Sequence, residues 1–328
     1  MPGRGAEGMR ITRRASLALP FLATPALGQN YPSRPIRAVV PFPAGGGVDT
    51  FARAIAPALT AALGQPVVVE NIGGASSRIG TQVVTRAAPD GLTILITNDT
   101  LAAVDALPVA GTPALVPGLA PVLLGATAPQ MLITHPRSGI RSAADYTARI
   151  KGRGAVHVGV PGLGSSQHFA SELLGQALGG RPEHVPYRGG GPLMLDLIAG
   201  TIDAGMVTLG AGIDQVREGR LVALGVTGAA RSPAAPDTPA FAEAAAPGFA
   251  IETWMGILAP AGTPAPILAA LHAAAVAAIR EAGVVRRLDS LGFAIPAIGP
   301  EPFGALLRDT VARFADVAGA VGIRTGDA

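Results

Sequence analysis

The feature that most constrains this chain is a repeated unit: a short apolar run, a glycine-rich turn and an amphipathic helix. In the first unit, residues 36–42 are apolar apart from Arg37, Pro43–Gly47 form the turn, and apolar side chains recur every fourth residue from Phe51 to Leu63. That helix should end at Gly64 and be kinked by Pro57. Units of this length predict a parallel sheet covered by helices. The expected elements that follow are a strand at 67–69, a helix at 79–88 and a strand at 92–96.

A second series of such units follows a glycine- and proline-rich stretch at residues 108–121. Ser142 and Asp145 fit a capping box at the start of its first helix. After Trp254–Pro260 the chain ends in helices at about 264–282 and 300–320, which suggests that it returns to complete a first lobe. The expected strands of this series lie at 131–134, 156–160, 184–185, 205–208 and 222–227, and its helices begin near Ser142, Ser166, Pro192 and Leu209.

The N-terminus has the pattern of an export signal. A basic stretch up to Arg14 precedes an apolar run over residues 15–27, which is too short to span a membrane. Residues 1–28 carry the whole formal charge of +3, so the remaining chain is neutral and its charge gives no case for nucleic-acid binding. We therefore predict a signal peptide at 1–28 and a periplasmic protein. The start, Met1 or Met9, and the route, Sec or twin-arginine, stay open.

The chain contains no cysteine, which excludes disulfides, thiolate nucleophiles and cysteine-ligated metals. Its five histidines show no metal-ligand spacing along the sequence. No catalytic grouping is visible either. We expect no cofactor, no bound metal and no enzymatic activity.

The first glycine-rich turn, Pro41–Asp49, is a candidate anion site. Gly45, Gly46 and Gly47 let the backbone approach a ligand closely, and Asp49 would cap the helix beneath them. A helix N-terminus favours an anion by about 0.3–1 kcal/mol when exposed and up to about 2 kcal/mol when partly buried. The alternative is a plain glycine turn with a capping aspartate. Phosphate-binding patterns do not fit this turn.

The turn at Gly159–His168 is a second candidate. Ser165 and Ser166 add hydroxyl donors to the backbone amides after Gly164. Neither serine has the flanking glycines of a nucleophile elbow. His168 lies inside the first helical turn, where a hydrogen-bonding role is favoured over catalysis.

Taken together, these motifs resemble the Bug receptors, the periplasmic solute-binding subunits of tripartite tricarboxylate transporters. The resemblance covers residues 31–324 in order. The matching segments are residues 41–49, 64–71, 88–91, 162–168, 185–189, 200–203, 231–233 and 259–264.

The resemblance implies a type II periplasmic-binding-protein fold, with two α/β lobes and a ligand cleft between them. Lobe 1 would comprise residues 30–125 and 253–328, and lobe 2 residues 126–252. The carboxylate of a small organic acid would be held between loops 43–49 and 162–168. The receptor would be a monomer that closes like a Venus flytrap and docks on the permease subunits. The alternative is a sensor protein that presents its ligand to a membrane histidine kinase.

Two segments depart from the family pattern and bear on the far end of the ligand. Ser76, Ser77 and Arg78 replace the usual glycines and asparagine, and Arg78 suits a second carboxylate. The alternative is a solvated arginine in a first helical turn. Asp99, near a strand end, could instead repel a second carboxylate or recognise an amine or hydroxyl. The full set of candidate ligand-binding residues is Phe42, Ala44, Gly45, Gly46, Gly47, Asp49, Ser76, Ser77, Arg78, Thr97, Asn98, Gly164, Ser165, Ser166, His168 and Thr208.

Overall fold

The described part of this computed structural model comprises residues 31–109, 111–152, 155–321 and 323, together with Gly3. The predicted signal peptide therefore lies outside the described residues, apart from Gly3. Within them, nine strands form one sheet in the order β2-β1-β3-β9-β4-β7-β5-β6, with β8 paired to β4. The predicted α/β class with parallel units is confirmed.

The first half of the sheet is built around three parallel strands. These are β1 (Ile36–Val40), β2 (Val67–Asn71) and β3 (Thr93–Asn98), and β9 (Glu252–Pro260) runs antiparallel to β3. Valine and isoleucine dominate the parallel strands, and β1 and β3 are almost entirely buried, as a strand covered on both faces requires.

The second half is built around β5 (His157–Val160), which pairs in parallel with β6 (Glu183–Pro186) and β7 (Ala204–Thr208). Strand β4 (Leu119–Thr134) joins the two halves. Its first part pairs with β9, and its last residues pair with β7 and β8 (Val222–Val226).

Strand β4 begins twelve residues before the start predicted at residue 131, so that prediction was wrong. Pro121 and Pro129 lie inside this strand, and proline is normally a sign against a central strand. The pairing with β9 shifts register near Pro121 and again near Ala126, and such irregularities let a proline-containing strand keep its partner.

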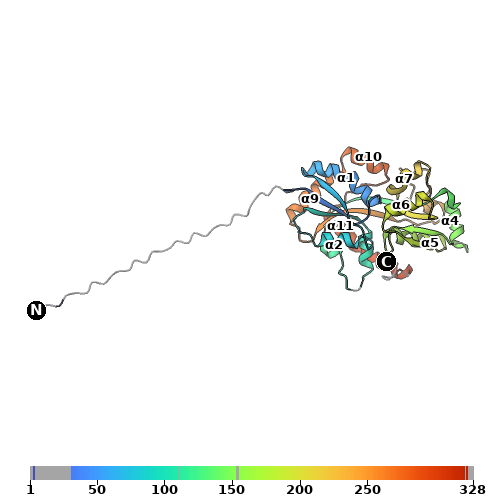
Figure 1. Ribbon diagram of the computed structural model, residues 1–328, viewed down its shortest axis with the longest axis horizontal. Helices are drawn as coiled ribbons and strands as arrows, with labels where there is room; N and C mark the ends of the chain where they lie inside the picture. The colour runs from blue at the N-terminus through green and yellow to red at the C-terminus, as the bar shows by residue number, and fades with distance from the viewer. Residues whose placement is uncertain (1–2, 4–30, 110, 153–154, 322, 324–328) are drawn as a thin grey trace. The chain divides into compact units, whose positions relative to one another are not determined.

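The helices of the first half are α1 (Gly47–Leu63), α2 (Arg78–Thr85) and α3 (Thr100–Ala106). Helix α1 continues through Pro57 and ends, as predicted, at Gly64, which takes a left-handed φ of 68°. Helix α3 was missed, because its short apolar sequence lies in the stretch read as an irregular departure from the family. Figure 1 shows α1 and α2 toward one end of residues 31–323, and α4 (Ala143–Lys151) and α5 (Ser166–Leu178) toward the other.

The second half carries α4 (Ala143–Lys151), α5 (Ser166–Leu178), α6 (Gly190–Ala199), α7 (Leu209–Arg217) and the short α8 (Phe241–Ala244). The side chain of Ser142 accepts a hydrogen bond from the backbone N–H of Asp145 at 3.1 Å, which confirms the predicted cap of α4. Two single-turn 3-10 helices, η1 (Val116–Gly118) and η2 (Pro136–Ser138), flank β4.

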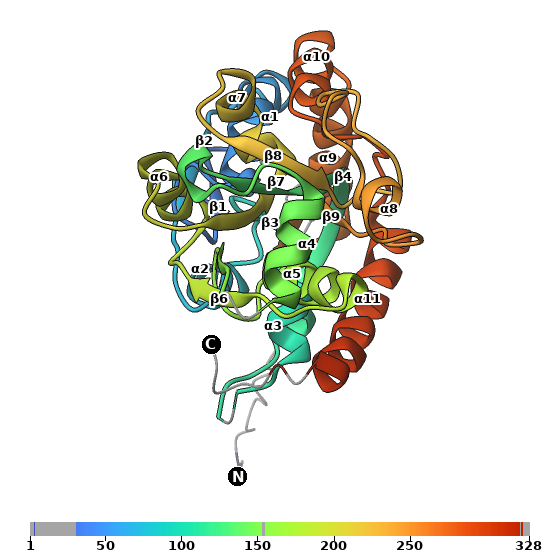
Figure 2. The same ribbon diagram turned by 90° about the vertical axis from the view of Figure 1, so that its right-hand side faces the viewer.

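After β9 the described residues form three helices rather than the two expected. They are α9 (Ala265–Ile279), α10 (Ala282–Ser290) and α11 (Pro300–Val321). Glu281 separates α9 from α10, because its carboxylate accepts from the N–H of Val284 at 2.9 Å and caps a new helix. Helix α9 packs on α1, and α11 lies beside α3 and also contacts α5 (Figure 2).

Among the described residues, no single helix has both the length and the apolarity needed to cross a membrane. Only α9 and α10 taken together pass that test, and they meet at a bend of 68°.

Candidate functional site

A small pocket lies where the N-termini of four helices meet, and we call it the inner pocket. Gly46 and Gly47 begin α1, Gln167 is the second residue of α5, Gly190 begins α6, and Thr208 precedes α7. Its volume is about 30 Å³. The lining residues are Phe42, Gly46, Gly47, Val48, Asn98, Pro161, Gln167, Gly190, Val207, Thr208 and Ala211.

The electrostatics of the inner pocket come from backbone dipoles. None of its lining residues is charged. Each helix N-terminus carries a partial positive charge and N–H groups without a partner inside the helix, so four that converge favour an anion without any lysine or arginine. This arrangement suits a group such as a carboxylate.

Asp49 holds the first glycine turn in shape. It is 4% exposed and accepts hydrogen bonds from the N–H of Gly45 at 3.0 Å, from Arg53 at 2.9 Å and from Asn71 at 2.9 Å. Burial alone would raise the pKa of Asp49, but the hydrogen bonds from Arg53, Gly45 and Asn71 outweigh it, and its pKa lies below the usual value. Its carboxylate is therefore ionised and fully occupied within the protein.

The backbones of the two halves meet at glycines. A Cβ on Gly191 would lie 2.0 Å from the carbonyl oxygen of Ala44, and a Cβ on Gly190 would lie 3.0 Å from the Cα of Gly46. Only glycine permits this approach, which brings the start of α6 to the start of α1.

The second predicted loop was expected to hold the carboxylate with its amides and hydroxyls, and this stays a prediction. Its amides already have protein acceptors: Gly164 donates to His168 Nδ1 at 3.1 Å, Ser165 to the carbonyl of Gly162 at 3.2 Å, and Ser166 to Thr100 Oγ1 at 3.2 Å. The hydroxyl of Ser165 accepts from the N–H of His168 at 3.2 Å. The loop presents Pro161 and the neighbouring Gln167 to the inner pocket instead.

Gln167 is a site residue that the sequence analysis missed. It is 5% exposed, and its Nε2 donates to Thr208 Oγ1 at 3.3 Å, so it links the starts of α5 and α7. The sequence signal that could have identified Gln167 was its position, as a polar residue in the first helical turn after a glycine-rich loop. The Gly189–Gly191 run, of which only Gly189 lies in the segment matched to the family at 185–189, was the signal for the third helix terminus.

A larger cavity of about 830 Å³, the outer pocket, shares Phe42 and Pro161 with the inner one. Arg188 is its single charged lining residue. The lining residues are Pro41, Phe42, Pro43, Asn71, Gly73, Gly74, Ala75, Ser76, Ser77, Pro161, Gly162, Leu163, Pro186, Tyr187 and Arg188.

Ser76 joins the halves across the outer pocket, since its Oγ donates to the carbonyl of Leu163 at 2.8 Å. Arg78 does not line either pocket. Its guanidinium donates to the carbonyl of Val104 at 2.7 Å, toward α3. Arg78 is the first residue of α2, the position expected in the alternative interpretation, although it is half-buried rather than solvated.

Asp99 does not line the inner pocket and faces protein hydroxyls. It is 2% exposed and accepts from Thr253 Oγ1 at 2.5 Å. Burial raises the pKa of Asp99 to about 6, against the opposing effect of hydrogen bonds from Thr253 and Ser166.

The pockets thus bring together part of the candidate set. Phe42, Gly46, Gly47, Asn98 and Thr208 line the inner pocket, and Phe42, Ser76 and Ser77 line the outer one. The candidates that line neither pocket are Ala44, Gly45, Asp49, Arg78, Thr97, Gly164, Ser165, Ser166 and His168. Ligand contact by any of the candidates stays a prediction.

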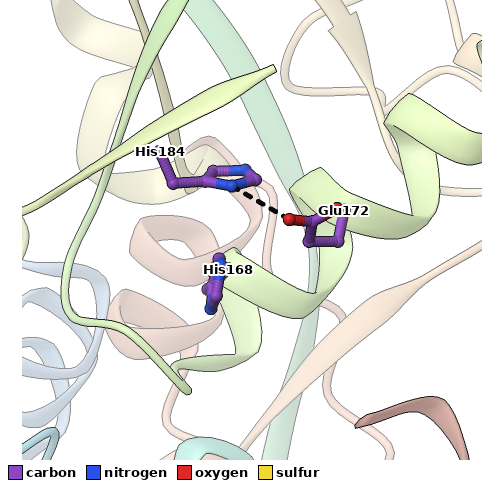
Figure 3. Close-up of side chains that lie close together, drawn as sticks. All are labelled: His168, Glu172 and His184. Carbon is purple, nitrogen blue, oxygen red and sulfur yellow. Dashed lines mark ion pairs between the residues drawn. The ribbon is translucent and has the colours of Figure 1, made fainter. Parts of the chain in front are cut away.

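A buried cluster of His168, Glu172 and His184 lies behind the second loop (Figure 3). Potential metal-ligand atoms of the three residues lie within 4.8 Å of one another. Sequence spacing gave no sign of it, because His184 comes from β6 and the other two from α5. His184 Nδ1 pairs with the Glu172 carboxylate at 3.2 Å, and the Glu172 pKa is lowered because the hydrogen bond and charge of His184 outweigh burial.

Comparison with known proteins places the chain in a family. Residues 51–323 match the model of the tripartite tricarboxylate transporter family receptor, TctC. Protein BugT of Bordetella pertussis is 33% identical over 324 residues, covering 94% of this chain and 97% of BugT. The chain belongs to the TctC family of receptors, which confirms the resemblance read from the sequence.

Two solved structures share the fold. MatC from Rhodopseudomonas palustris, solved with bound malate, matches with a TM-score of 0.82 at 31% identity, over 88% of this chain and 99% of MatC. Rpa4515 from R. palustris, solved with adipate, matches with a TM-score of 0.84 at 30% identity, over 90% of this chain and 99% of that protein. The expected periplasmic-binding-protein fold is confirmed, while the lobe boundaries stay a prediction.

Proposed function

We propose that this chain captures a small organic carboxylate in the inner pocket and delivers it to the membrane subunits of a tripartite tricarboxylate-type transporter. The observation that carries the proposal is the convergence of four helix N-termini on a pocket without charged side chains. Such a site stabilises an anion and repels a cation.

The size of the inner pocket fits one carboxylate group. A volume of about 30 Å³ has room for roughly two water-sized groups, which matches the two carboxylate oxygens. The rest of the ligand would then extend into the outer pocket, which shares Phe42 and Pro161. Malate and adipate, found in the two related structures, are both dicarboxylates, and this supports a short dicarboxylate as the ligand.

A binding role without catalysis is part of the proposal. The Ser165 hydroxyl is bonded by the backbone N–H of His168, while the imidazole accepts from Gly164, so serine and ring are not arranged as nucleophile and base. The family is one of receptors. We propose a monomer that acts in the periplasm, and that opens and closes around its ligand.

Calorimetric titration of the purified protein with malate, adipate and matched monocarboxylates tests this proposal. A micromolar ligand corresponds to about 8 kcal/mol of binding free energy, and saturation at 100 times Kd should raise the unfolding free energy by about 2.7 kcal/mol. A diamine of similar length serves as the control and should not bind. Binding of the diamine with no response to any acid would contradict the proposal.

A matched pair of variants tests whether the ligand binds in the inner pocket. Gln167→Leu removes a polar group from the inner pocket, and Gln176→Leu makes the same change on the exposed side of α5. Loss of a hydrogen bond to a charged group costs about 1.5–3 kcal/mol, so Gln167→Leu should weaken acid binding by roughly 10- to 100-fold. Gln176→Leu should leave it unchanged. Equal affinities in the two variants would place the ligand elsewhere.

A further inference from the structure

The loop at residues 161–167 contributes to the walls of both pockets. Pro161 lines both, Gly162 and Leu163 line the outer pocket, and Gln167 lines the inner one. A small displacement of this loop would therefore change both ends of the proposed ligand site. The position of this loop depends on the hydrogen bonds that fix its backbone.

His168 ties the loop to the first turn of α5 with two buried hydrogen bonds. Its ring Nδ1 accepts from the N–H of Gly164 at 3.1 Å, and its backbone N–H donates to Ser165 Oγ at 3.2 Å. His168 is 4% exposed. Only the first bond depends on the protonation state of the ring, because a protonated imidazole has no acceptor nitrogen.

The surroundings of the ring include several titratable groups. Glu172 lies one turn further along α5, and His184, from β6, stands at 78° to the His168 ring with centroids 4.6 Å apart (Figure 3). Arg181, in the connection to β6, and Tyr146, in α4, act electrostatically with Glu172. The second nitrogen of His184 lies 2.8 Å from Ser171 Oγ.

A metal ion is a poor occupant of this cluster as it stands. Because Nδ1 of His168 accepts from Gly164, the neutral ring carries its proton on Nε2. A metal ligand needs a lone pair on the coordinating nitrogen, so ligation through Nε2 would move the proton to Nδ1 and break the bond to Gly164. The hydrogen bond between Gly164 and His168 therefore disfavours a metal ion in this cluster.

We propose that neutral His168 is a positioning residue of the ligand site: its Nδ1 holds the Gly164 amide and so fixes the loop that lines both pockets. This inference rests on the proposed carboxylate binding. Protonation replaces the acceptor with a second donor facing the Gly164 N–H, and the loop must shift. Ligand affinity therefore falls when the ring gains a proton, and lowering the pH from 8 to 5.5 tests this.

His168→Asn gives a sharp test, because the asparagine Oδ1 occupies the position of Nδ1, accepts from the same N–H, and does not titrate in this range. His135→Asn is the matched control, since His135 Nδ1 also accepts a backbone N–H, from Arg137 at 3.0 Å, on an exposed turn. Titrations at pH 8 and 5.5 use an acid that is fully ionised at both. Wild type and His135→Asn should lose roughly 2- to 10-fold in affinity, the worth of one hydrogen bond, and His168→Asn less than twofold.

The outcomes separate this inference from the proposed function. Failure of the wild type to bind any acid at pH 8 would count against carboxylate binding itself. Binding with equal affinity at both pH values, or an equal loss in His168→Asn, would overturn the role of His168. If that variant does not fold, the Gly164 amide resonance of the wild type, followed by NMR without ligand, should titrate together with the His168 ring. A Gly164 resonance that ignores the ring would also overturn the inference.

Discussion

Replacement of Gly47 by alanine should separate folding from ligand binding. Gly47 is the first residue of α1, and its φ is not left-handed, so its backbone accepts alanine. Alanine is favoured over glycine inside a helix by about 0.5–1 kcal/mol, with less gained at the first position, so the change in backbone propensity by itself should not make unfolding easier. The added Cβ, however, would lie 2.6 Å from both Cβ and Oγ1 of Thr208, across the inner pocket.

The clash sets the size of the effect. Carbon atoms pack at about 3.5–4.0 Å, so α1 and Thr208 must separate by roughly 1 Å. A hydrogen bond of about 2.9 Å that spans the pocket through the ligand would then stretch beyond its useful length. One such bond to a carboxylate is worth about 1.5–3 kcal/mol, which predicts a 10- to 100-fold loss of affinity by calorimetry.

Two further variants serve as controls for the Thr208 clash. Gly319→Ala, in α11, adds a Cβ with no neighbour within 4 Å and should leave affinity unchanged. Adding Thr208→Gly to Gly47→Ala removes the clashing atoms and should recover part of the lost binding. A Gly47→Ala protein that binds within twofold of the wild type would refute the claim that these two residues close on the ligand.

Three other changes have outcomes that follow from the structure. Because the pKa of buried Asp99 is raised to about 6, the folded state holds this proton more tightly than the unfolded state, and Asp99 costs stability as pH rises from about 4 to 6. In urea unfolding, the unfolding free energy of Asp99→Asn relative to that of the wild type should rise by up to about 3 kcal/mol as the pH increases from about 4 to 6. A difference that is independent of pH would contradict this expectation. Arg188→Ala should weaken dicarboxylate binding by up to about fivefold in low-salt titrations while sparing monocarboxylates, because exposed charge pairs contribute about 0.2–1 kcal/mol. Arg78→Ala should leave both unchanged, since Arg78 is bonded to Val104, and the reverse pattern would restore Arg78 as the distal contact.

The strand and helix pattern could be predicted from sequence wherever local signals were strong. Gly64 ended α1 and Ser142 capped α4 because each acts on neighbouring backbone groups. The start of β4 could not be predicted, since the partner that tolerates Pro121 is β9, far away in the sequence. Helix α3 lacked both a capping side chain and a periodic apolar face of useful length.

The site was predictable to a similar extent. The glycines at the start of α1 were recognisable because the anion-binding property of a helix N-terminus is local. The amides of Gly164 and Ser166 looked equally suitable, but their acceptors, His168 and Thr100, are supplied by folding. Gly190 and Gln167 join the pocket only because four helices start at one place, which is a property of the topology.

A crystal structure with a bound dicarboxylate tests the central claim most directly. The account predicts one carboxylate in the inner pocket, with its oxygens about 2.7–3.2 Å from backbone N–H groups of Gly46, Gly47 or Val48, and without a lysine or arginine on that end. A ligand whose carboxylates are held only by arginine side chains, or that lies outside the inner pocket, would contradict it.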